Sequence, residues 1–188
     1  MRSLVRRAFA GMLGLVAVAM MATLVTAAPA GAATAATATR AGGPTHVWTA
    51  GLRWPYVRPG NRGERVVAVQ YLLQQKGYAV PATGFYGATT TAAVKKFQAS
   101  RGLNPSGNVG PSSWDRLIVT VRFGSRGPAV RAVQHSMRYA YGFRFQQVTG
   151  FFGAQTQTVV RAFQRGSRLP VTGVVNPQMW MTMIWFES

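Results

Sequence analysis

The sequence predicts an all-α protein made of two small three-helix domains in tandem, preceded by a signal peptide. Three observations lead to this fold class. The chain repeats itself, with an offset of 64 residues between Val66 and Val130 and of 66 residues between Phe97 and Phe163. Apolar residues within each copy recur at helical spacing. The chain also opens with basic residues and an uncharged apolar run, as exported precursors do.

Residues 1–33 are organised like a secretory signal peptide. Basic residues come first, an apolar run follows, and small residues close the segment with an Ala-x-Ala pattern at Ala30 and Ala32. We expect cleavage after Ala32 or the next residue, and export by general secretion. The adjacent Arg6 and Arg7 also resemble a twin-arginine signal, so the route stays open. An uncleaved transmembrane anchor is the alternative, since about 20 apolar residues span a bilayer.

Residues 34–59 are predicted to form a flexible leader before the first domain. An Ala/Thr tract without apolar periodicity is followed by Trp48, Trp54 and Tyr56 among glycine and proline residues. Aromatic side chains in an extended arm either stack on sugars or dock on the neighbouring domain. We expect docking.

The first predicted helix of each copy follows an Arg-Gly pair. Its apolar stripe has the spacing i, i+3, i+7 of one helix face. The stripe is Val66, Val69 and Leu73 in the first copy and Val130, Val133 and Met137 in the second. Gly77 and Gly142 are expected to end these helices. A two-residue insertion in the second copy lies between this helix and the next loop, around residues 139–145.

Two further helices complete each predicted copy. A glycine turn precedes the second helix, whose buried face is the Val-x-x-Phe pair that ends at Phe97 or Phe163. A proline in the first turn starts the third helix, at Pro111 and Pro177, and a tryptophan follows three residues later. These elements place the first domain at residues 60–119 and the second at residues 122–186.

The ionisable residues argue against an enzyme. The chain has no cysteine, which excludes disulfide frameworks, cysteine-ligated metal sites and a cysteine nucleophile. The carboxylate and imidazole groups are few, and none recurs between the copies: Glu64, Asp115, Glu187, His46 and His135. Acid–base catalysis needs two or three such groups in one pocket. We therefore expect no catalytic residue, no metal and no cofactor.

The charge balance predicts attraction to polyanions. The chain carries 21 Lys and Arg against 3 Asp and Glu, a formal net charge of +18. Loss of the signal peptide removes three arginines and leaves about +15. An exported protein of this charge adheres to wall polymers, anionic lipid and nucleic acid. A GC-rich coding bias also accounts for abundant Arg, Ala and Gly, so both explanations of the basicity stay open.

The same order of residues occurs in both copies. Arg-Gly is followed by an apolar-x-x-apolar-Gln segment, Gly-Phe-[Tyr/Phe]-Gly-x-x-Thr, Val-x-x-Phe-Gln, and then Leu, Gly, Val, Pro and x-x-Trp. This order resembles the peptidoglycan-binding domain 1 family and covers residues 60–185. The resemblance implies a three-helix bundle that holds exported proteins on peptidoglycan. One departure is that the family commonly has Asp before the first loop glycine, where this chain has Thr83 and Thr149.

The recurrence and the resemblance together select candidate peptidoglycan-binding residues. They are Thr83, Gly84, Tyr86, Gln98, Arg101, Thr149, Gly150, Phe152, Gln164 and Arg168. Tyr86 and Phe152 are expected at the surface, and the preceding Phe85 and Phe151 in the core. The amides of Gln98 and Gln164 either bond wall peptide groups or tie a helix end to a loop. Cationic residues on and after the second helices are expected to form a rim beside the glycine loops.

The sequence thus predicts a secreted, non-catalytic, cell-wall-associated protein that binds peptidoglycan through two modules. Its expected partner is a glycan strand or stem peptide. The alternative is an exported cationic binder of wall polyanions, such as teichoic-type polymers, or of nucleic acid.

Overall fold

A computed structural model describes residues 53–144 and 147–186, and in this part of the chain the fold is helical. The first copy comprises α2 (Glu64–Gln75), α3 (Ala88–Ser100) and α4 (Pro111–Leu117). The second comprises α5 (Pro128–His135) with a π-helical continuation η1 (Ser136–Ala140), then α6 (Ala154–Gly166) and α7 (Pro177–Phe186). The predicted all-α fold of two three-helix copies is confirmed there. The predicted signal peptide lies outside the described residues.

Short backbone pairings, two in each copy, connect the loops around the helices. Arg62 pairs with Phe85 and Val57 with Val109, and the second copy repeats both pairings at Arg126–Phe151 and Val121–Val175. The first helix of each copy begins just after the pairing of Arg62 or Arg126, and the residue before it is Gly63 with φ 110° or Gly127 with φ 109°. Such φ values are accessible to glycine at little steric cost, which explains the Arg-Gly pair of each copy.

The end of the predicted leader docks on the first copy. The Trp54 ring stacks on Trp114 with 5.5 Å between ring centroids. The Trp54 indole N–H donates to the Asp115 carboxylate at 2.9 Å, and the Trp114 indole N–H donates to the Pro55 carbonyl at 2.7 Å. Docking is therefore confirmed for Trp54. Tyr56 is exposed, and Trp48 lies outside the described residues.

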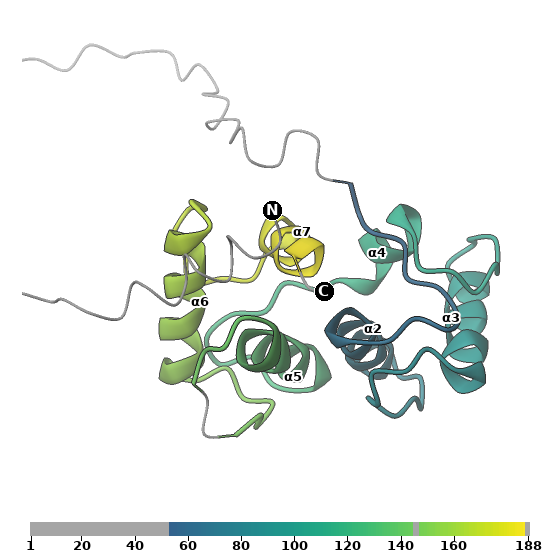
Figure 1. Ribbon diagram of the computed structural model, residues 1–188, viewed down its shortest axis with the longest axis horizontal. Coiled ribbons are helices and arrows are strands. Elements are labelled where there is room, and N and C mark those ends of the chain that lie inside the picture. Colours follow the sequence, from purple (N-terminus) through teal and green to yellow (C-terminus); the bar gives the residue numbers. More distant parts are fainter. Residues whose placement is uncertain (1–52, 145–146, 187–188) are drawn as a thin grey trace, which may run out of the picture.

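The two copies pack through their first helices. Figure 1 shows α2 and α5 side by side, with α3 and α6 on opposite outer sides. Glu64, at the start of α2, contacts His135 at the end of α5 with 2.6 Å between Oε2 and Nδ1. At the other end, the Ala129 backbone N–H near the start of α5 donates to Gln75 Oε1 at 3.0 Å. The helices are therefore antiparallel.

More of α2 is buried than its predicted stripe, and its Val67 lies against Gly84 of its own copy. Val67, Ala68 and Leu72 are buried together with the predicted stripe residues, so apolar side chains are covered on more than one face. Apolar side chains on two faces of a helix need covering elements on both sides. Here α5 supplies the second cover, and the copies form one packed unit with a shared core.

The π-helical segment explains part of the insertion in the second copy. Gly77 corresponds to Gly142, an offset of 65 residues, whereas Leu73 and Met137 before it differ by 64. One extra residue therefore falls within η1, which ends two residues before Gly142. A π-bulge accommodates one residue without ending a helix. The same closing bond follows, with Tyr78 N–H donating to the Leu73 carbonyl and Phe143 N–H to the Met137 carbonyl.

Among the described residues, no helix is both long and apolar enough to cross a membrane.

We expect enlargement of a small residue in the shared core to destabilise the fold. Ala68 and Ala132 recur at the same position of α2 and α5 and are 1% and 0% exposed. Ala132→Leu adds methyl groups to this packed region and should lower the free energy of unfolding by about 1–3 kcal/mol. Chemical denaturation measures the change. Ala92→Leu, on the exposed side of α3, is the control and should stay within about 0.5 kcal/mol of the parent. Equal effects of the two changes would contradict tight packing at Ala132.

Candidate functional site

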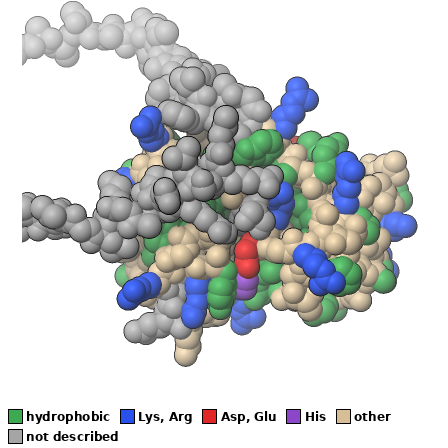
Figure 2. Space-filling model, viewed as in Figure 1, with side chains coloured by type: hydrophobic (Ala, Val, Ile, Leu, Met, Phe, Trp, Pro, Cys, Tyr) green, Lys and Arg blue, Asp and Glu red, His purple; other side chains and the backbone are tan. Residues whose placement is uncertain are grey.

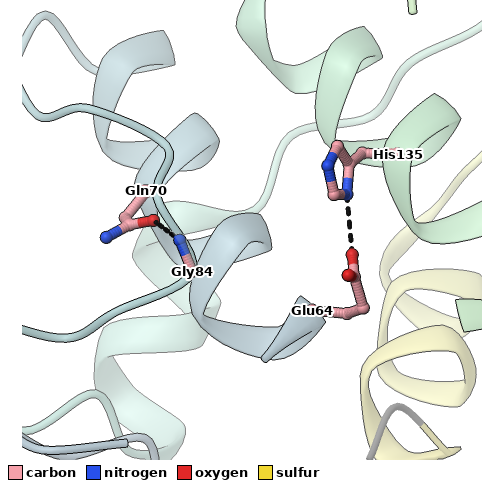
Figure 3. Close-up of polar contacts among 4 residues, drawn as sticks. All are labelled: Glu64, Gln70, Gly84 and His135. Carbon is pink, nitrogen blue, oxygen red and sulfur yellow. Dashed lines mark hydrogen bonds and ion pairs between the residues drawn. The ribbon is translucent and has the colours of Figure 1, made fainter. Parts of the chain in front are cut away.

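A buried glutamine on the first helix holds the first glycine loop of each copy. This loop comprises residues 83–87 in the first copy and 149–153 in the second. In the first copy, the Gly84 N–H donates to Gln70 Oε1 at 2.9 Å, as Figure 3 shows. The Gln70 amide N–H groups donate to the Phe85 carbonyl at 2.9 Å and to Thr90 Oγ1 at 3.0 Å. One side chain thereby fixes both the loop and the first turn of α3.

The second copy repeats this arrangement. The Gly150 N–H donates to Gln134 Oε1 at 2.9 Å, and Gln134 Nε2 donates to the Phe151 carbonyl and to Thr156 Oγ1 at 3.0 Å each. Both glutamines are at most 2% exposed. Buried hydrogen bonds are costly to leave unmade, so the two loops are firmly positioned.

Gln98 and Gln164 have a matching role at the second glycine loop. Each accepts a hydrogen bond from a glycine N–H at 2.9 Å, from Gly107 and Gly173 respectively. Their amide nitrogens donate to the carbonyls of Asn108 at 2.8 Å and of Val174 at 2.9 Å. Both side chains are 2% exposed. Of the two sequence alternatives, the structural tie between helix and loop is therefore the one observed.

The expected exposure of Tyr86 and Phe152 is wrong, because both side chains are 0% exposed. Adjacent residues in extended backbone point to opposite sides, and the pairing of Phe85 with Arg62 turns Phe85 outward and Tyr86 inward. The Tyr86 hydroxyl donates to the Gly107 carbonyl at 2.7 Å. Burial raises the pKa of this hydroxyl. Tyr86 and Phe152 are thus core residues.

The exposed aromatic residues of the loops are Phe85 and Phe151, so their expected place in the core is wrong. They are 40% and 36% exposed. The guanidinium carbon of Arg62 lies 4.1 Å from the centroid of the Phe85 ring, and Arg126 lies at the same distance over Phe151. Two features of the sequence could have indicated this arrangement: the recurring Arg-Gly pair, and the rule that adjacent side chains in an extended segment point to opposite sides.

Each exposed phenylalanine and the arginine over it form an aromatic platform. The backbone at a glycine lies on the other side of the ring. A Cβ atom on Gly87 would lie 3.1 Å from a Phe85 ring carbon, and one on Gly153 would lie 3.2 Å from the Phe151 ring. Contacts this short displace the ring, so glycine permits the close approach. Each phenylalanine is thereby held between an arginine and the backbone while part of its ring stays exposed.

Thr83 and Thr149 lie at the surface of the same loops. Their hydroxyl oxygens accept hydrogen bonds from the backbone N–H groups of Phe85 at 3.2 Å and Phe151 at 3.1 Å. The following Gly84 and Gly150 have φ values of 74° and 75°, in the left-handed region. Threonine therefore maintains the turn without the negative charge of the aspartate that the family commonly has there.

The structure separates Arg101 and Arg168 from these loops. Both are exposed and lie just beyond the C-terminal ends of α3 and α6, whereas the loops precede the N-terminal ends. A helix of 13 residues spans about 20 Å. Lys95 and Arg161 instead lie against the second glycine loop of their copy, beside Gly107 and Gly173. The expected cationic rim therefore does not gather at the first loop.

Two shallow hollows adjoin the glycine loops. One, of about 280 Å³, lies at the first loop of the second copy, where Thr149, Phe151 and Gln155 line it with the amide of Gln147. The other, of about 260 Å³, lies at the second loop of the first copy and includes Tyr56. The lining is polar and apolar in both. Each hollow adjoins a loop that a buried glutamine holds, Gln98 in the first copy and Gln134 in the second.

The acidic residues in the described part are engaged in structural contacts. Glu64 contacts His135 across the copies, and Asp115 accepts from Trp54. No group of three or more metal-ligating side chains occurs among the described residues.

Removal of a loop-tying amide should destabilise the first copy. Gln98→Leu leaves the Gly107 N–H and the Asn108 carbonyl without their side-chain partner. Buried groups left unpaired cost about 1–3 kcal/mol each, so we expect a loss of about 2–3 kcal/mol in the free energy of unfolding. Gln155→Leu, at an exposed position of α6, is the control in the same denaturation assay. Equal stability of the two variants would contradict the role assigned to Gln98.

The Tyr86 hydroxyl permits a milder test. Tyr86→Phe removes the bond to the Gly107 carbonyl and installs the residue that the second copy carries as Phe152. We expect a folded protein whose free energy of unfolding falls by about 1–2 kcal/mol, because the carbonyl loses a buried donor. Tyr56→Phe, at a tyrosine that is 57% exposed, should have little effect. A parental melting temperature for Tyr86→Phe would show that its hydroxyl contributes nothing.

The comparisons with known proteins agree with the repeated architecture. A family model described as "Putative peptidoglycan binding domain" matches residues 62–117 and again residues 126–183. A similar curated sequence is an uncharacterized protein in the bpoA1 3' region of Kitasatospora aureofaciens, 40% identical over 65 residues. A similar solved structure is a peptidoglycan-binding protein from Clostridioides difficile in complex with glutamine hydroxamate, at 40% identity and a TM-score of 0.33.

These two matches are partial. The matched region covers 34% of this chain in each case, with 55% of the Kitasatospora protein and 40% of the Clostridioides chain. The family model, in contrast, covers more than half of the chain and occurs once in each three-helix copy. The chain therefore belongs to the peptidoglycan-binding domain family, as a tandem member.

Proposed function

We propose that the protein is an exported, non-catalytic component of the cell wall that binds peptidoglycan through the first glycine loop of each copy. Family membership supports peptidoglycan as the ligand. The observation that carries the choice of site is the aromatic platform that recurs in both copies, Phe85 under Arg62 and Phe151 under Arg126.

The chemistry of each platform suits a polymer of sugars and peptides. The exposed edge of the ring, which lies between the arginine and the glycine backbone, provides apolar surface for a sugar. The guanidinium beside it donates several hydrogen bonds and attracts carboxylates, which the stem peptides of peptidoglycan carry. Phe151 also lines the hollow next to Thr149 and Gln155, which adds hydrogen-bonding groups to the same place. Thr83, Gly84 and Thr149 remain proposed contact residues on this basis, whereas Gly150 is buried.

Duplication strengthens binding to a polymeric ligand. The packing of α2 against α5 fixes the two loops on one unit. Once one loop is bound, the second meets its ligand at a high effective concentration, and avidity can exceed single-site affinity by roughly 10²–10⁴. Fixed loops also lose little conformational entropy on binding, because buried glutamines already hold them.

We propose no catalytic step for the protein. Glu64 and Asp115 both have structural partners, and the matched family is one of binding domains. Acid–base hydrolysis needs a pair of groups placed around the scissile bond. The two loops offer aromatic, hydroxyl and guanidinium groups instead.

We expect the platforms to be required for wall binding. Phe85→Ala and Phe151→Ala each remove the exposed ring, and each should weaken co-sedimentation with purified peptidoglycan by about tenfold, the effect of losing about 1.4 kcal/mol. The double variant should lose more than either single change, because the avidity of two sites is lost.

Phe123→Ala is the matched control, since Phe123 is 57% exposed and lies on a different turn. Circular dichroism verifies that each variant stays helical. Binding by the folded double variant at the level of the Phe123→Ala control would contradict the proposed site.

A further inference from the structure

The two copies differ in charge at one structurally equivalent place beside the first glycine loop. A Cβ atom on Gly84 would lie 3.2 Å from Val67 Cγ2, and one on Gly150 would lie 2.9 Å from Arg131 Nε. Val67 and Arg131 differ by the 64-residue offset of the repeat. The first copy therefore covers its loop with a buried valine, and the second covers the same loop with an exposed arginine.

The Arg131 side chain is placed for an external partner. The aliphatic part of the side chain contacts the loop, since a Cβ atom added to Gly150 would lie 3.1 Å from Arg131 Cγ. Among the residues that the structure describes, none forms a hydrogen bond or ion pair with its guanidinium. Packing of the stem restricts the side chain while the charged end stays in solvent. Binding an anion here therefore immobilises less of the arginine than binding to an unsupported side chain.

A second guanidinium group, that of Arg126, lies against the next residue of the same loop. Arg126 covers the exposed Phe151 ring, and Arg131 covers the adjacent Gly150. The first copy has only the arginine that corresponds to Arg126, namely Arg62 over Phe85. Two guanidinium groups on consecutive loop residues are therefore a property of the second copy.

Little negative charge opposes this pair. The chain has 3 Asp and Glu against 21 Lys and Arg. Glu64 contacts His135 and Asp115 bonds Trp54, so both acidic residues of the described part are engaged elsewhere. Figure 2 shows Lys and Arg side chains on both halves of the visible face. The positive potential around the loop is therefore not locally cancelled.

We propose that Arg126 and Arg131 form an anion site in the second copy that binds the phosphate groups of a phosphodiester polymer of the cell wall. Guanidinium groups match phosphate oxygens with paired hydrogen bonds. A polymer with repeated phosphates releases counterions at each contact, so several guanidinium groups strengthen its binding together. This activity goes beyond peptidoglycan binding and separates the roles of the copies: the first recognises peptidoglycan, and the second also holds an anionic polymer.

The test uses the full mature chain and long-chain inorganic polyphosphate as the probe, with affinity measured across a salt series. Arg131→Val gives the second loop the residue of the first copy, so the fold should be retained. The slope of log affinity against log salt should become shallower by about 1. Val67→Arg, the reciprocal change, should steepen the slope by a similar amount.

Arg116→Gln is the control, because it removes one exposed arginine from α4 in the first copy. If Arg131→Val and Arg116→Gln lower the affinity equally, binding follows net charge and the site is overturned. An unchanged slope for Arg131→Val with an unchanged melting curve overturns it too.

Wall samples then identify the source of the phosphate. We expect Arg131→Val to weaken binding to native walls and to leave binding to walls stripped of phosphate polymers at the parental level. An equal loss on both wall samples would contradict a phosphate ligand. Duplex DNA serves as a further probe. If Arg131→Val weakened binding to DNA and left binding to native walls unchanged, the wall polymer would be excluded as the ligand. Failure of the parent chain to bind stripped walls would instead refute the peptidoglycan proposal and leave the polyphosphate result standing.

Discussion

The fold depends on buried glutamine side chains that bond the backbone of the glycine loops. Gln70, Gln98, Gln134 and Gln164 each accept from a glycine N–H and donate to a loop carbonyl. An amide suits this position because it offers both an acceptor and donors on one planar group. Small helical units bury little apolar surface, so polar groups inside them must be fully paired. The loops that carry the exposed side chains are therefore as well positioned as the helices.

The contact between the copies is the second level of organisation. Packing of α2 on α5 gives each of these helices a cover that its own copy does not supply. Both ends of the contact also have polar bonds, through Glu64 and His135 at one end and Gln75 and the Ala129 N–H at the other. Such directional contacts define the register of two helices that are otherwise apolar. The tandem repeat consequently behaves as one unit.

The sequence predicted what depends on spacing within one element. The helical periods of Val66, Val69 and Leu73 and the prolines at helix starts gave the helices and their order. Two features depend on contacts between distant segments and were missed. Pairing of Phe85 with Arg62 decides which of two consecutive aromatic residues faces the core, and it reversed the expected positions of Phe85 and Tyr86. The extra burial of α2 depends on contacts outside the helix, because Val67 lies against Gly84 of its own copy and α5, which follows about 60 residues later, packs on α2.

The antiparallel arrangement of α2 and α5 has a consequence for the direction of a bound chain. A glycan strand has two chemically different ends, so a site that recognises it also recognises its polarity. The equivalent loops follow equivalent helices that run in opposite directions. A strand that runs along these helices therefore meets one loop in the forward sense and the other in reverse. If both proposed loops bind glycan, their simultaneous use therefore favours two strands of opposite polarity.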